Sequence, residues 1–144
     1  MQEEQRQLKA MAIIRRPSDG ALLVSVGVSP SGEVFHRPLG GSIEFGEYAA
    51  DAIRREFLEE IAQDLTNVRL AGVLENLFRW GDVAAHEVDF IFTAAFADEA
   101  AYEIAEQQIL DQSEPSPVIW RAPDDKTPLY PNGLAELAAQ AANP

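Results

Sequence analysis

The chain has 144 residues, of which 47% are hydrophobic, and a formal net charge of −13. This length suits one domain spanning residues 1–144 with a core of ordinary size. The excess of acidic residues opposes generic binding to nucleic acid, which relies on lysine and arginine. The absence of cysteine excludes disulfides, thiolate nucleophiles and zinc–thiolate sites. With no apolar run long enough to span a bilayer and no signal-like start, we expect a cytoplasmic protein without a membrane partner.

The first part of the chain predicts β-structure. Residues 8–15 and 21–28 have the composition of strands and are joined by the turn signal PSDG, so we expect a hairpin. After a second turn, an extended piece over residues 33–38 leads into Gly40 and Gly41. These two glycines free the backbone to turn sharply and let a carbonyl group approach a bound ion or phosphate.

A long helix is predicted over residues 48–65, because Ile53, Phe57 and Ile61 repeat every four residues and form an apolar stripe. Glu47 lies at the start of this helix, where the helix dipole favours negative charge. From there its carboxylate can also reach acidic side chains on the helix.

The second part of the chain predicts four more elements. Residues 67–78 and 87–96 have the pattern of strands and form a second hairpin, 118–121 is a short strand, and 133–142 is a closing helix. Strand pairs with one helix between them and another after them indicate a layered α/β or α+β fold.

Three glutamates on the long helix form the most informative feature. Glu56, Glu59 and Glu60 stand at i, i+3 and i+4 and therefore share one face. Their charges repel, and the neighbouring apolar stripe shields them partly from water, which makes the repulsion costlier. Arg55 pairs with Glu59 at i+4 and offsets part of it. Three carboxylates within one turn remain a natural cage for Mg²⁺ or Mn²⁺.

Residues 41–63 resemble the Nudix box of the MutT-like Nudix hydrolases. The signature is a glycine, five residues, a glutamate, seven residues, Arg-Glu, an apolar residue, any residue and Glu-Glu. The matching positions in this sequence are Gly41, Glu47, Arg55, Glu56, Phe57, Glu59 and Glu60.

Two positions depart from this signature. Ala62 stands where the family has glycine, and Gln63 where it has an aliphatic residue. Glycine permits the left-handed turn that ends a helix, so we expect alanine either to let the helix run on or to strain its end.

The resemblance implies a fold and an activity. The fold is an α/β/α sandwich with a mixed β-sheet between helices. The activity is Mg²⁺-dependent cleavage, with Mn²⁺ as an alternative ion, of a diphosphate linkage in a nucleoside triphosphate, a nucleotide sugar or ADP-ribose. By similarity, Glu56 and Glu60 are the principal metal ligands, Glu59 and the carbonyl of Gly40 assist, and Arg55 orients the carboxylates.

The general base is left open between three positions. Glu114 resembles the loop position used by some family members, Glu87 on a predicted strand is the rival, and a glutamate of the box is the third. For Glu114 and Glu87, a solvated surface role is as well supported. His36 and His86 are interpreted as structural or surface residues.

Substrate contacts are expected from Gly41, Glu47 and Arg37. For Arg37 the reason is that the planar fork of arginine can bind a phosphate. Further candidates for phosphate binding are Arg15, Arg16 and Arg79, each of which could equally be a surface residue. Candidates for base stacking are Phe78 and Trp80, which could equally pack in the core or at a dimer interface.

Two other readings and one assembly state complete the hypotheses. A Nudix-like module that binds a nucleotide or a protein without turnover is the alternative, although such modules lose box carboxylates and this chain keeps them. A structural Ca²⁺ site would need a loop of alternating acidic ligands, which the sequence lacks. The resemblance is also compatible with a homodimer.

Overall fold

The computed structural model describes residues 3–110 and 116–142. Its elements are, in order, β1 (Glu3–Ile14), β2 (Leu22–Val28), β3 (Val34–Arg37), β4 (Leu39–Ser42), α1 (Ala49–Ile61), β5 (Leu65–Trp80), β6 (Val83–Phe96), the short 3₁₀ helix η1 (Glu99–Glu103), β7 (Glu106–Gln108), β8 (Pro117–Arg121) and α2 (Leu134–Ala142).

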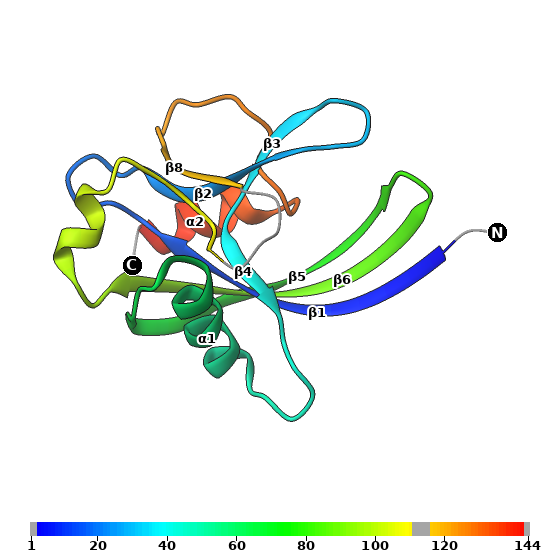
Figure 1. The fold of residues 1–144 in the computed structure, drawn as a ribbon, viewed down its shortest axis with the longest axis horizontal. Coiled ribbons are helices and arrows are strands. Elements are labelled where there is room, and N and C mark those ends of the chain that lie inside the picture. Colours follow the sequence, from blue (N-terminus) through cyan, green and yellow to red (C-terminus); the bar gives the residue numbers. More distant parts are fainter. Residues whose placement is uncertain (1–2, 111–115, 143–144) are drawn as a thin grey trace.

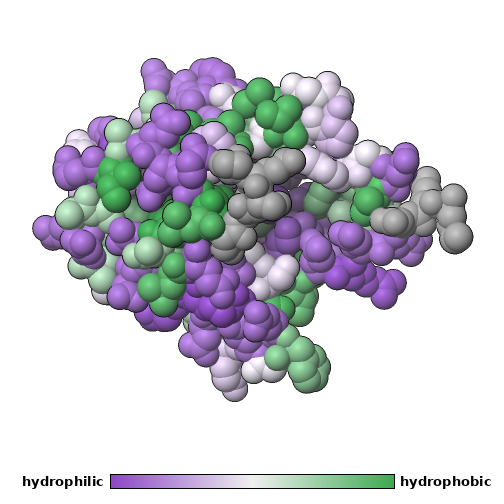
Figure 2. Space-filling view, in the orientation of Figure 1, coloured by the Kyte–Doolittle hydropathy of each residue, from purple (hydrophilic) through white to green (hydrophobic). Residues whose placement is uncertain are grey.

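The strands form two four-stranded sheets. The first, sheet A, has the order β4-β1-β6-β5 and is mixed, because β1 and β6 run parallel while the outer pairs are antiparallel. The second, sheet B, has the order β3-β2-β8-β7 and is entirely antiparallel. Most of the face seen in Figure 2 is hydrophilic, as a strongly acidic chain requires.

The two helices pack on opposite faces of sheet A. Successive side chains of β1 point to opposite sides. Ala10 and Ala12 belong to the core cluster with α1, while Met11 and Ile13 belong to the cluster with α2. Figure 1 shows α1 on one side of this sheet and α2 on the other, beside sheet B. The expected α/β/α order with a mixed sheet between helices is therefore confirmed. No helix in the described part of the chain is long and apolar enough to cross a membrane.

The first predicted hairpin is wrong. β1 and β2 enter different sheets, and only an isolated bridge joins Arg15 to Leu22. The reason lies in the run from Ala10 to Ile14, which is buried at every position. A strand buried on both faces belongs in the middle of a sheet, and β1 is paired on both edges. The second predicted hairpin, β5 with β6, is confirmed.

The helix α1 ends at Ile61, earlier than residue 65. Ala62 adopts the left-handed conformation, with φ 57° and ψ 39°, and its N–H donates to the carbonyl of Leu58 at 3.0 Å. The N–H of Gln63 reaches back to the carbonyl of Phe57 at 3.4 Å. The bond from Ala62 to Leu58 is that of the αL type of helix end, in which the left-handed residue is usually glycine. Alanine therefore does not extend the helix and instead takes on a strained conformation.

Candidate functional site

Arg55 is the centre of the acidic cluster on α1. Its Nε and Nη2 donate to the two carboxylate oxygens of Glu47 at 2.8 and 3.0 Å. Its Nη1 donates to Glu56 at 3.1 Å and to Glu59 at 3.1 Å, so the i,i+4 pair expected from the sequence is present. Nη2 also donates to the carbonyl of Ser42 at 3.0 Å. One guanidinium therefore joins the loop before the helix to two carboxylates on the helix.

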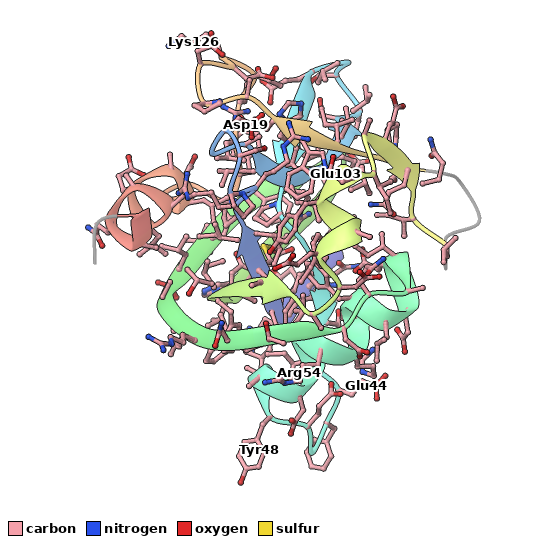
Figure 3. All side chains as sticks on the ribbon, turned by 90° about the vertical axis from the view of Figure 1, so that its left-hand side faces the viewer. Asp19, Glu44, Tyr48, Arg54, Glu103 and Lys126 are labelled. Atoms are coloured by element: carbon pink, nitrogen blue, oxygen red, sulfur yellow. The ribbon has the colours of Figure 1, made fainter. Side chains whose placement is uncertain are left out.

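These contacts fix the protonation states of Arg55 and Glu47. Hydrogen bonds from Arg55, and to a lesser extent from the backbone N–H of Glu44 at 3.0 Å, lower the pKa of Glu47 to about 2. The same bond raises the pKa of Arg55 above its usual value. Figure 3 shows Glu44 and Tyr48 on the segment that leads into α1, with Tyr48 at the lower edge of the molecule. Both oxygens of Glu47 are occupied, so its carboxylate holds Arg55 in place.

The two glycines of β4 are required by close approach. A Cβ on Gly41 would lie 2.5 Å from the carboxylate carbon of Glu56, and a Cβ on Gly40 would collide with the carbonyl oxygen of Ala10. The backbone of β4 therefore passes directly against the carboxylate of Glu56 and against β1. This brings strand backbone and helix carboxylates to one place, as the glycine pair predicted.

A cavity of about 150 Å³ lies beside these residues, between β1 and β4 of sheet A and the strands of sheet B. It brings together Arg37, Gly40, Gly41 and Glu60, four of the residues singled out in the sequence, and Lys9, which was not. Glu60 contributes from α1 and Arg37 from β3. The lining therefore carries one acidic residue, Glu60 from α1 (the acidic wall), and two basic residues, Lys9 from β1 and Arg37 from β3 (the basic wall).

The three glutamates differ in environment. Glu59 is 46% exposed at its side chain, Glu56 is 12% exposed, and Glu60 as a residue is only 5% exposed. Within residues 3–110 and 116–142, no three acidic or histidine side chains are already gathered closely enough to hold a metal ion. The donor chemistry nevertheless suits a hard divalent cation, since the carboxylate of Glu56 lies against the strand backbone at Gly41 and oxygen ligands are what such an ion prefers.

The two candidate bases outside the box have different outcomes. Glu114 lies outside the residues that the structure describes. Glu87 is 2% exposed, and its carboxylate forms ion pairs with Lys9 at 3.2 Å and with Arg37 at 3.8 Å. The surface reading of Glu87 is therefore wrong. Its neighbour Asp89 is fully buried.

Lys9 and Asp89 are the members of this region that sequence reasoning missed. A signal was present, because each interrupts an otherwise apolar run, in LKAMAII and in VDFIF. A charged residue in the middle of a buried strand needs a partner, and it marks a place where charges meet.

A second cleft of about 240 Å³ is lined by aromatic side chains. Phe78 and Trp80, the expected stacking residues, both contribute to it, together with Phe35 and Tyr130. The rings of Phe35 and Trp80 lie 5.9 Å apart and edge-on. Arg37 lines this cleft as well as the cavity, so one side chain connects the two. Arg79 also lines the aromatic cleft.

The other predicted arginines act elsewhere. Arg15 donates to the carbonyl of Ala138 in α2 at 2.8 Å, which ties β1 to that helix. Arg16 pairs with Asp19 at 2.6 Å and lies over the ring of Trp120. Neither lines the cavity beside Glu60.

The two histidines are structural or exposed, as expected. His36 is buried, its Nδ1 lies 2.9 Å from a guanidinium nitrogen of Arg121, and burial lowers its pKa. A neutral imidazole accepts this hydrogen bond. His86 lies 2.8 Å from Glu75 in an exposed pair on the surface of sheet A.

Comparison with known proteins agrees with this geometry. The model of the NUDIX domain matches residues 5–137. The structure is similar to that of a MutT NUDIX hydrolase from Burkholderia pseudomallei, with a TM-score of 0.68 and 22% identity over 94% of this chain and 98% of that chain. A NUDIX hydrolase from Nitrosomonas europaea gives a TM-score of 0.69 and 15% identity over 96% of this chain and 90% of that one.

An ADP-ribose pyrophosphatase from Streptococcus suis matches with a TM-score of 0.60 and 18% identity, over 96% of this chain and 92% of that chain. No curated protein sequence matches. Because the family model covers nearly the whole sequence and the fold agrees with it, the chain belongs to the Nudix hydrolase family.

Proposed function

We propose that the protein is a metal-dependent hydrolase that cleaves the diphosphate linkage of a nucleotide-type substrate. The observation that carries this proposal is the position of Glu60. Its buried side chain lines a cavity whose other wall holds Arg37, and Arg37 extends into the aromatic cleft. The site therefore contains three groups in a row. These are the carboxylate of Glu60 for a cation, the guanidinium of Arg37 for a phosphate, and the aromatic rings for a base.

Glu56 and Glu60 are assigned as the principal metal ligands, with Glu59 and the carbonyl of Gly40 assisting. A bound Mg²⁺ or Mn²⁺ would polarise the diphosphate and make water a better nucleophile. Arg55 orients the carboxylates of Glu56 and Glu59 toward each other, since one of its nitrogens donates to both.

The nucleoside is assigned to the aromatic cleft. Phe78, Trp80 and Phe35 provide ring faces or edges for a base, and the amide of Asn132 lies in the same cleft as a polar partner. The fold is also similar to proteins named as an ADP-ribose pyrophosphatase and a UDP-X diphosphatase, whose names place their substrates in this class.

The general base of such a hydrolase must be a carboxylate that water can reach. Glu87 is held by two cations inside the protein, which suits a positioning role. Glu59 is the most exposed of the three glutamates Glu56, Glu59 and Glu60, and Glu114, outside the described residues, is the second candidate. With no cysteine in the sequence, we place the enzyme in the cytoplasm.

The test is a panel of nucleoside triphosphates, nucleotide sugars and ADP-ribose incubated with Mg²⁺, repeated with Glu60→Gln. We expect turnover of at least one compound and a loss of kcat of roughly 10²-fold or more in the variant, because a metal ligand is weakened. Glu136→Gln, an exposed glutamate on α2, is the matched control and should retain full activity. Turnover that survives Glu60→Gln would refute the assignment, and turnover of no compound would favour the binding-module alternative.

A further inference from the structure

Four charged side chains meet beside the basic wall of the cavity. Lys9 on β1 pairs in register with Asp89 on β6, and Glu87 lies two residues before Asp89 on the same face of the sheet. Arg37 joins them from β3. Lys9 and Arg37 line the cavity, whereas Glu87 and Asp89 are buried behind them.

The two carboxylates of this cluster are not equally satisfied. Glu87 has Lys9 at 3.2 Å and Arg37 at 3.8 Å. Neither oxygen of Asp89 has a hydrogen-bond partner among the residues that the structure describes. Two ionised carboxylates this close in a buried place are costly. Burial, and then repulsion by Glu87, raises the pKa of Asp89 to about 7.

The protonation of Asp89 decides the charge of the cluster. The charged groups around it are Lys9 from β1, Arg37 from β3 and Glu87 from its own strand. When Asp89 is neutral, two cations face one carboxylate and the wall is positive. This excess lies beside a cavity that is large enough for a phosphate group and that Glu60 of α1 also lines. In a chain with a net charge of −13 such a local device is what an anionic ligand requires.

We propose that Lys9 and Arg37 form a phosphate-binding site in the cavity that Glu60 also lines, and that the buried carboxylates of Glu87 and Asp89 position these two cations. The identity of the ligand as a substrate phosphate rests on the proposed function. The site itself does not require turnover or metal, so it can be tested alone. Anion binding is expected to weaken as the pH rises through 7, because Asp89 then ionises and cancels the excess positive charge.

The first experiment uses the fact that Lys9 and Lys126 are the only lysines in the sequence. The protein, labelled with ¹³C and ¹⁵N at lysine, is titrated with inorganic phosphate in the presence of EDTA and followed by NMR. The side-chain signals of Lys9 should move and those of the exposed Lys126 should stay, with Lys126→Met giving the assignment. A Lys9 signal that is insensitive to phosphate would overturn the proposal.

Calorimetry under the same conditions measures the contribution of Lys9. Lys9→Met should weaken phosphate binding by roughly tenfold, the effect of losing one charge-assisted contact, and Lys126→Met should leave it unchanged. Lys9→Met also removes one of the two cations that neutralise the buried carboxylate of Glu87. Lys9→Arg therefore serves as a second variant, which keeps the positive charge and should retain most of the affinity for phosphate. Equal weakening by Lys9→Met and Lys126→Met would count against the site.

The positioning role of Asp89 is tested by the pH dependence of anion binding. Sulfate is the probe, because the charge of sulfate is constant near neutral pH. Sulfate binding to the wild type should weaken several-fold between pH 6 and pH 8.5. Asp89→Asn, which imitates the protonated carboxyl group, should bind as the wild type does at pH 6 and lose this dependence. A variant that keeps the full pH dependence would contradict the role of Asp89.

The two proposals fail separately. If no diphosphate compound is hydrolysed but phosphate still moves the Lys9 signals, the anion site stands and the proposed function falls. If hydrolysis is found but phosphate leaves the Lys9 signals unmoved and Lys9→Met has an unchanged KM, the hydrolase stands and the anion site falls.

Discussion

The acidic face of α1 and the buried cluster behind the cavity use opposite arrangements of the same charges. On α1, the guanidinium of Arg55 is surrounded by glutamates, and the net charge of this group stays negative. The acidic face therefore favours binding of a cation. Behind the cavity, the carboxylate of Glu87 is flanked by Lys9 and Arg37, and the sum is neutral or positive. A cavity between two such walls suits a metal-bound diphosphate, because each wall complements one half of the ligand.

The largest expected effect comes from Gly41→Ala, which disturbs the acidic wall alone. The new Cβ would lie within 2.6 Å of both carboxylate oxygens of Glu56 and displace them. Because misplacing a reactive group by about 1 Å can cost roughly 10²-fold, kcat/KM should fall by about that factor. Ser42→Ala, at an exposed side chain next to it, is the control and should stay close to wild type. Activity retained in Gly41→Ala would show that the position of Glu56 is unimportant.

Arg55→Lys should have the next largest effect. Lysine keeps the charge but loses the fork that holds both oxygens of Glu47 and also reaches Glu56 and Glu59. We expect kcat/KM to fall by about tenfold, in line with the loss of one strong charge-assisted contact. The control is Arg54→Lys, since Arg54 donates to the carbonyl of Leu65 instead of to the acidic cluster. Equal effects of the two variants would argue against a special role for Arg55.

A smaller effect is expected at the end of α1, away from both walls. Ala62→Gly removes the cost of a left-handed alanine and should raise the free energy of unfolding by about 1 kcal/mol, as measured with urea. Activity should not change. Ala97→Gly, at an exposed alanine after β6, gives the comparison, and a destabilised Ala62→Gly would contradict the account of the helix end.

The last prediction concerns the effect of pH on stability and tests the buried carboxylates Glu87 and Asp89. The pKa of Asp89 is raised from 3.8 to about 7, so the folded state binds a proton that the unfolded state has released. Its contribution to stability is therefore present below pH 4 and is lost as the pH rises toward and through 7. Between pH 5.5 and pH 8 the Tm of Asp89→Asn should therefore fall by about 6 °C less than the Tm of the wild type. The lowered pKa of His36 acts in both proteins and cancels in this difference. Parallel Tm curves would exclude titration of Asp89 in this range.

Sequence alone determined the acidic face of α1. The i, i+3 and i+4 spacing of Glu56, Glu59 and Glu60 is a property of any helix, and the pair between Arg55 and Glu59 follows from the same local geometry. The close approach of backbone at Gly40 and Gly41 was predictable for a similar reason, since glycine admits what other residues exclude. The β5–β6 hairpin was also local, because its strands are joined by a short turn.

Tertiary structure alone decided the basic wall. Lys9 meets Asp89 only because β1 pairs in parallel with a strand far along the chain, and no local pattern specifies that partner or its register. The same long-range pairing replaced the expected β1–β2 hairpin. It also buries Glu87, which the sequence left open as a surface carboxylate. Alternation along a strand predicts which residues share a face, but it does not predict which face another layer covers.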